Sequence, residues 1–102
     1  MHEITIAGKK YPVRLSMGAI REFKRQTGKE VDDITGISDM GELLYACTVS
    51  TCRFQGKKFS LTVEQFTDDL DVTQATTAFM GVLSEGGFSS AAAEPEDKKK
   101  EE

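Results

Sequence analysis

The chain has 102 residues, of which 13 are basic and 17 acidic, so its net charge is −4 at pH 7. This charge argues against a nucleic-acid groove or an anionic membrane as partner, and no apolar run is long enough to cross a bilayer. No signal-peptide pattern precedes the first predicted strand, so we expect a cytoplasmic protein. The length predicts a single α+β domain over residues 1–88, followed by a disordered charged tail over 89–102.

Residues 3–15 predict an antiparallel β-hairpin around Gly8-Lys9. Glycine at the first central position supplies the positive φ of a type II′ turn. That turn pairs Ile6 with Tyr11 and Ile4 with Val13 on an apolar face. The other face is predicted to be exposed to solvent, and it carries Glu3, Thr5, Pro12 and Arg14. Because proline cannot donate a ladder hydrogen bond, the second strand is predicted to be an edge, which leaves the first strand free for a further partner.

The hairpin leads directly into a predicted helix over residues 17–27. Ser16 is a good N-cap, and Gly28 is suited to the left-handed conformation that ends a helix. An inward stripe at helical spacing is predicted to lie on the apolar face of the hairpin, and it consists of Met17, Ile20, Phe23 and Thr27.

Residues 29–37 predict an irregular connector, whose Val31, Ile34 and Ile37 are expected to turn toward the core. A long central helix follows and ends at Gly56. Its start is open between Ser38 and Asp39, where Asp39 with Glu42 matches a capping box. The apolar stripe of this helix consists of Met40, Leu43, Leu44, Cys47 and Thr51.

The two cysteines, Cys47 and Cys52, lie five residues apart on that predicted helix. Helix geometry separates their Cα atoms by about 8 to 9 Å and their directions by roughly 140°. This spacing suits neither a disulfide nor a shared metal, so both are predicted to be reduced packing residues.

Residues 57–61 are predicted to be extended and able to form a third short strand beside the first. Thr62 with Gln65 gives a capping box for a short helix that runs to Leu70. Asp71 with Gln74 repeats the pattern and begins a last helix to about residue 85. The inward stripe of that helix comprises Val72, Ala75, Phe79, Val82 and Leu83, with Met80 beside it.

No catalytic, cofactor or metal site is predicted. The single histidine, His2, is far in sequence from any cluster of nucleophiles, so the sequence does not favour a Ser/His/Asp catalytic triad. Asp68, Asp69 and Asp71 resemble the start of a calcium loop, but no glutamate closes it at the required spacing. These carboxylates are predicted to be helix caps and solvated neighbours. The pattern favours a binding protein over an enzyme.

The order of these signals over residues 3–83 resembles the tail assembly chaperones of long-tailed bacteriophages and their prophages. The resemblance is carried by the hairpin with Tyr11-Pro12-Val13, by Met17-Gly18-Ala19, and by the helix end at Thr27-Gly28-Lys29. It continues with Leu43-Leu44-Tyr45-Ala46, Cys52-Arg53 and the helix start from Leu61-Thr62 to Phe66.

The resemblance implies a protein without enzymatic activity that acts in the cytoplasm of the bacterial host. Its partner would be the tape measure protein, which it would keep soluble while tail tube protein assembles around it. The family also implies a longer form of the chain made by ribosomal frameshifting, and a slippery adenine-rich stretch would encode Lys98-Lys99-Lys100. A merely solubilising tail is the alternative for these lysines, and self-association of the chain stays open.

A chaperone of this kind needs apolar surface that adapts to helical clients, for which methionine and phenylalanine are well suited. We predict that the last helix supplies part of it through Phe79, Met80 and Leu83, with Phe88 nearby. The competing prediction is that Phe79 and Leu83 belong to the core. An alternative function is a structural phage component, such as a small connector or tail-completion protein.

Overall fold

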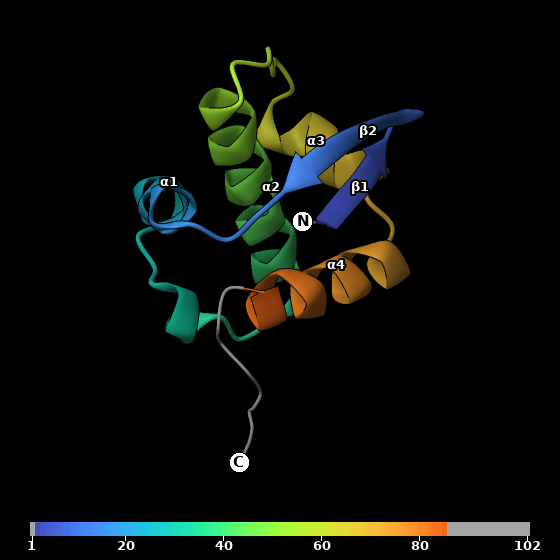
Figure 1. The fold of residues 1–102 in the computed structure, drawn as a ribbon. Helices are drawn as coiled ribbons and strands as arrows, with labels where there is room; N and C mark the ends of the chain where they lie inside the picture. The colour runs from blue at the N-terminus through green and yellow to red at the C-terminus, as the bar shows by residue number, and fades with distance from the viewer. Residues whose placement is uncertain (1, 86–102) are drawn as a thin grey trace, which may run out of the picture.

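The computed structural model describes residues 2–85, and the predicted tail lies outside this range. Within these residues the chain forms an N-terminal antiparallel hairpin and four α-helices, which confirms the predicted α+β class (Figure 1). The strands are β1 (His2–Ile6) and β2 (Lys9–Val13). The helices are α1 (Met17–Thr27), the 3₁₀ turn η1 (Val31–Asp33), α2 (Ile37–Phe54), α3 (Val63–Asp69) and α4 (Val72–Glu85).

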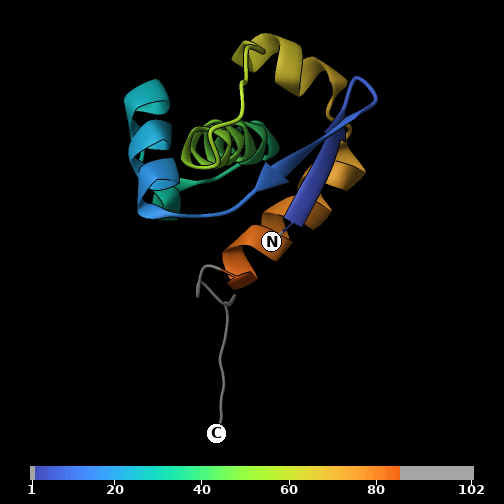
Figure 2. The same cartoon turned by 45° about the horizontal axis from the view of Figure 1, so that its top comes forward.

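Helix α2 is the centre of the fold, as predicted. Figure 2 shows it nearly end-on, with α1 on one side, α3 above it, and the hairpin and α4 on the remaining side. Four of its predicted stripe residues are buried in the core: Leu43, Leu44, Cys47 and Thr51. Ile4, Ile6 and Val13 come from the hairpin, and Phe23, Phe66 and Val82 come from the surrounding helices. One apolar core therefore joins all the elements.

The hairpin forms, but its predicted register is wrong by two residues. Ile4 pairs with Tyr11, and Ile6 pairs with Lys9. The turn is Ala7-Gly8, where both residues have positive φ, 52° and 78°, as a type I′ turn requires. A shift of two keeps every side chain on its predicted face. Pro12, on the face predicted to be solvent-exposed, is nevertheless buried, whereas Glu3 and Thr5 on the same face are exposed.

The predicted third strand is absent from the described residues, since 57–61 contain no strand. Phe59 explains why this segment lies elsewhere: its ring packs edge-on to Tyr11, with centroids 5.4 Å apart, and also contacts Tyr45 and Phe66. Side chains instead occupy the free edge of β1. Gln74 accepts from the Thr5 N–H (2.8 Å) and donates to the Thr5 carbonyl (3.2 Å), and Asp69 accepts from the Ala7 N–H (2.6 Å).

Both predicted ends of α1 are confirmed. Ser16 Oγ accepts from the Ala19 N–H at 3.2 Å, and Gly28 ends the helix with φ 78°. The predicted inward stripe is partly wrong, because Met17 is exposed and the buried residues are Ala19, Glu22 and Phe23. The reason is that α1 packs mainly against α2 and not on the hairpin.

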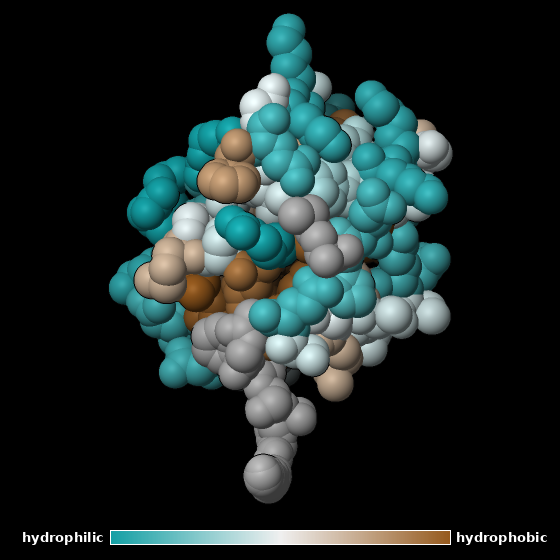
Figure 3. Space-filling view, in the orientation of Figure 1, coloured by the Kyte–Doolittle hydropathy of each residue, from teal (hydrophilic) through white to brown (hydrophobic). Residues whose placement is uncertain are grey.

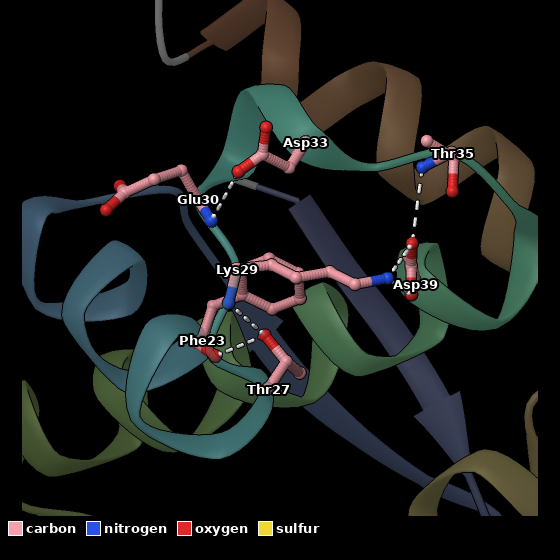
Figure 4. A network of polar contacts seen from close by, with 7 residues as sticks. All are labelled: Phe23, Thr27, Lys29, Glu30, Asp33, Thr35 and Asp39. Atoms are coloured by element: carbon pink, nitrogen blue, oxygen red, sulfur yellow. Dashed lines mark hydrogen bonds and ion pairs between the residues drawn. The ribbon is translucent and has the colours of Figure 1, made fainter.

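The connector before α2 is more ordered than predicted and is held by polar contacts (Figure 4). Lys29 donates to both Asp39 oxygens at 3.1 and 2.9 Å, and the Thr35 N–H donates to the same carboxylate at 3.2 Å. This carboxylate therefore does not cap α2, and the prediction of Asp39 as the N-cap is wrong. The helix begins at Ile37 after Gly36, which offers no side-chain cap. Val31 and Ile34 contact the core as predicted, whereas Ile37 is exposed.

The starts of the last two helices are confirmed. Thr62 and Gln65 form a reciprocal capping box at α3. Asp71 Oδ1 accepts from the Gln74 N–H at 2.8 Å at the start of α4, but the Gln74 side chain turns to β1 and does not complete a box. Ala75, Phe79 and Val82 are buried as predicted, and Val72 is exposed. Among residues 2–85, no helix combines the length and the apolar character needed to span a bilayer.

Candidate protein-binding surface

The four residues predicted to bind a partner have different environments. Phe79 is buried in the core, which agrees with the competing prediction for this side chain. Leu83 is half-buried against the core, Met80 is exposed, and Phe88 lies outside the described residues. On the face shown in Figure 3, apolar side chains reach the surface in a small hollow, whereas most of the surrounding surface is hydrophilic. Within the predicted set, Met80 is the described residue most available for a partner.

Five large apolar side chains are more than half exposed within residues 2–85: Met17 (75%), Ile37 (54%), Phe54 (76%), Val72 (58%) and Met80 (55%). The sequence placed Met17, Ile37 and Val72 on inward-facing positions. All three are the first residues of their helices. A first-turn residue can satisfy the helical spacing and still lie beyond the edge of the core.

Ile37 and Val72 flank an apolar groove of about 340 Å³ between α2, α3 and α4. Three helix starts converge there, since Ile37, Val63 and Val72 each open a helix. The other apolar positions in the lining are Gly41, Leu70 and Ala75. A volume of this order suits the few side chains of one partner helix or peptide.

Helices α2 and α3 meet at the floor of the groove. A Cβ atom on Gly41 would lie 3.4 Å from the Thr67 methyl group, which is ordinary van der Waals contact. The Thr67 hydroxyl donates to the Val63 carbonyl at 2.7 Å within its own helix. Because the hydroxyl is satisfied there, Thr67 presents its methyl group to Gly41, and this part of the groove stays apolar.

The polar rim of the groove includes two carboxylates, Glu42 from α2 and Glu64 from α3. Ser38 adds a hydroxyl. An apolar floor with an acidic rim fits a helix that presents apolar side chains flanked by lysine or arginine. The arrangement is therefore suited to protein binding.

Polar contacts fix the walls of the groove. The ion pair of Lys29 with Asp39 holds the first turn of α2, and so the position of Ile37 (Figure 4). The hydrogen bond from Lys29 lowers the pKa of Asp39 below its ordinary value, and the Thr35 N–H acts in the same direction. The caps at Thr62 and Asp71 hold Val63 and Val72 in the same way.

The aspartates and cysteines that the sequence offered as candidate chemical sites have structural explanations. Asp69 and Asp71 accept hydrogen bonds from backbone amides, and no three metal-ligating side chains cluster within residues 2–85. Cys47 and Cys52 are free and buried, as predicted. Burial raises the pKa of the Cys47 thiol to about 12.

Comparison of the chain with protein-family models, with curated proteins and with solved structures found no match.

Proposed function

We propose that this protein is a phage tail assembly chaperone that binds the tape measure protein and keeps it soluble during tail tube assembly. The order of sequence signals over residues 3–83 supports this function. The observation that carries it in the structure is the apolar groove flanked by the exposed Ile37 and Val72. The tape measure protein would be bound through the apolar side chains of one helix face.

The groove differs from the surface predicted on the last helix. Val72 and Ala75 lie in the first half of α4, whereas Met80 and Leu83 lie in its second half. We place the principal contact at the groove because it combines exposed apolar side chains with a concave floor. Contact through Met80 and Phe88 stays a separate prediction, and it is wrong if changing both to serine leaves client binding intact.

Co-expression with the long helical protein encoded just downstream tests the proposed function. We expect the client to be insoluble alone and to be recovered in a soluble complex with this chain. A client that is soluble alone, or that never copurifies with the chain, would contradict the chaperone function.

The alternative is a structural phage component, which shares this small size. Mass spectrometry of purified particles distinguishes the two functions, because a chaperone acts before the tail is complete. Abundant chain in purified particles would favour the structural role.

The proposed function extends to a longer form made by frameshifting near Lys98-Lys99-Lys100. The gene sequence tests this part directly. We expect a slippery heptamer followed by an overlapping downstream reading frame. A gene that lacks both contradicts the longer form and leaves the groove unaffected.

A further inference from the structure

A hollow rich in arginine lies between the start of α1 and the end of α2, away from the apolar groove. Its volume is about 270 Å³. It is lined by Arg14, Ser16, Arg21, Ser50, Arg53 and Phe54, and Gly18 completes the wall. The described residues that line it include no acid, although the whole chain has a net charge of −4. The hollow is therefore a positively charged region on a chain whose net charge is negative.

Arg14 is incompletely satisfied within the described part of the chain. Its Nε is enclosed and has no hydrogen-bond partner there. Its guanidinium carbon lies 5.2 Å from the centroid of the Phe54 ring, a cation–π arrangement that holds the group in place. Because the ring fixes the guanidinium, an oxyanion that reaches its terminal N–H groups would find a preorganised partner.

The positive charge of the hollow is only partly compensated. Arg53 lies 3.8 Å from Glu22, and Glu22 also pairs with Arg25 at 2.7 Å. Within residues 2–85, no ion pair joins Arg14 or Arg21 to an acid. At least two guanidinium groups are therefore available to a ligand.

The hollow also contains a buried hydroxyl group. Ser50 is buried and lies 3.4 Å from the Ser16 hydroxyl. A Cβ atom on Gly18 would come within 2.7 Å of the Ser50 oxygen, so glycine leaves the space that this hydroxyl occupies. The hydroxyl can donate to an oxyanion that the arginines attract.

An exposed aromatic ring borders the same charges and indicates the kind of ligand. Phe54 lines the hollow and is 76% exposed. A free inorganic anion would leave this ring uncovered. An acidic amphipathic helix satisfies the arginines and covers the ring with its apolar side chains.

We propose that this hollow binds carboxylate side chains of an acidic, amphipathic helical segment of a partner protein. Apolar side chains of the same segment would pack on Phe54. The chain's own residues 86–102 match less well, because three lysines follow directly on the acids Glu94, Glu96 and Asp97. The proposal rests on the hollow itself and holds independently of the chaperone function.

Fluorescence anisotropy with the full chain and a labelled synthetic helical peptide tests the proposal. The peptide carries glutamates at helical spacing beside a leucine face, and its control replaces each glutamate by lysine. We expect saturable binding of the glutamate peptide alone. The affinity should fall between low and high salt, because screening weakens contacts between exposed charges.

Two matched variants locate the binding. Arg21→Gln removes an exposed guanidinium without a described ion pair, so the thermal melt should not change. We expect it to weaken peptide binding about threefold to tenfold. Lys10→Gln removes the same charge on the hairpin and should change the affinity less than about twofold.

Three outcomes would overturn the proposal. The glutamate peptide fails to bind the full chain, or Arg21→Gln and Lys10→Gln weaken it equally. The third is that inorganic phosphate or a single-stranded oligonucleotide binds more tightly than the peptide and displaces it, which would assign the hollow to phosphate groups.

Discussion

Asp39 is the residue that joins the connector to the central helix, and its ionisation should influence stability. Its carboxylate binds Lys29 and the Thr35 N–H, and its pKa is lowered in the folded state. A lowered pKa contributes stability that is fully present above the ordinary aspartate range, about pH 4, and that is lost as pH falls through the folded pKa. We therefore expect Asp39→Asn to flatten the acid side of the stability profile.

The measurement is urea unfolding from neutral pH down through and below the ordinary aspartate range, about pH 4. Asp68→Asn is the charge-matched control, because Asp68 is exposed. The control should keep the acid-side slope of the parent chain. Equal slopes for Asp39→Asn and the parent would contradict the assigned role of Asp39.

Cys47 should be chemically inert in the folded protein. Its thiol is buried, and its pKa of about 12 keeps it protonated at neutral pH, whereas the thiolate is the reactive form. We expect alkylation followed by mass spectrometry to leave Cys47 unlabelled in native buffer and to label it fully in denaturant. Rapid native labelling would contradict the packing described here.

Residue burial was predictable from the sequence where a side chain lies in the middle of a helix. Leu43, Phe23 and Val82 have packed neighbours on both sides along the helix, and all three are buried as predicted. The same periodicity failed at Met17 and Val72, and the expectation that Ile37 turns from the connector toward the core was also wrong. All three are first-turn residues, which have no packed turn before them. These failures are informative, since Ile37 and Val72 flank the candidate groove.

At the scale of elements, the edge of β1 is closed by side chains in place of a third strand. Thr5 pairs with Lys10 at a position whose N–H and C=O point away from β2, and Gln74 binds both groups. Gln74→Ala should destabilise the fold by about 1 kcal/mol, because two hydrogen bonds to the backbone are lost.

Two measurements check the role of Gln74. Urea unfolding gives the free energy, with Thr77→Ala as an exposed control on the same helix that should change it by less than about 0.5 kcal/mol. Hydrogen exchange then reports the specific contact: we expect the Thr5 amide to lose protection in Gln74→Ala alone. Unchanged protection of that amide would show that Gln74 does not close the edge.

The helix starts at Ser16, Thr62 and Asp71 were predictable because a side chain at each position bonds a nearby amide. The start of α2 was missed, since Gly36 has no side chain and the nearest acid is used by Lys29. The hairpin register was missed because the positive φ of Ala7 has no signal in the sequence. The conformation of residues 57–61 was mispredicted because it depends on ring contacts between residues distant in sequence, which local patterns do not encode.

At the scale of the whole molecule, the central helix separates two surfaces of opposite character. The groove between α2, α3 and α4 is apolar with an acidic rim, and the hollow between α1 and α2 is basic and bordered by the Phe54 ring. The sequence indicated a binding protein without a catalytic cluster. It could not indicate either surface, because each assembles residues from elements that are far apart in the chain.

The central claim is that the groove binds the client. Co-expression and pull-down with the downstream helical protein test it most directly. The variant is Ile37→Ser with Val72→Ser, both exposed, so its thermal melt should stay close to that of the parent chain. Met80→Ser is the matched comparison, because Met80 is an equally exposed apolar residue of α4 outside the groove.

We predict that the double variant recovers at least about fivefold less soluble client, the loss expected when about 1 kcal/mol of apolar contact is removed. Met80→Ser should keep most of the recovery. Full recovery with the folded double variant, or loss with Met80→Ser alone, would contradict the groove.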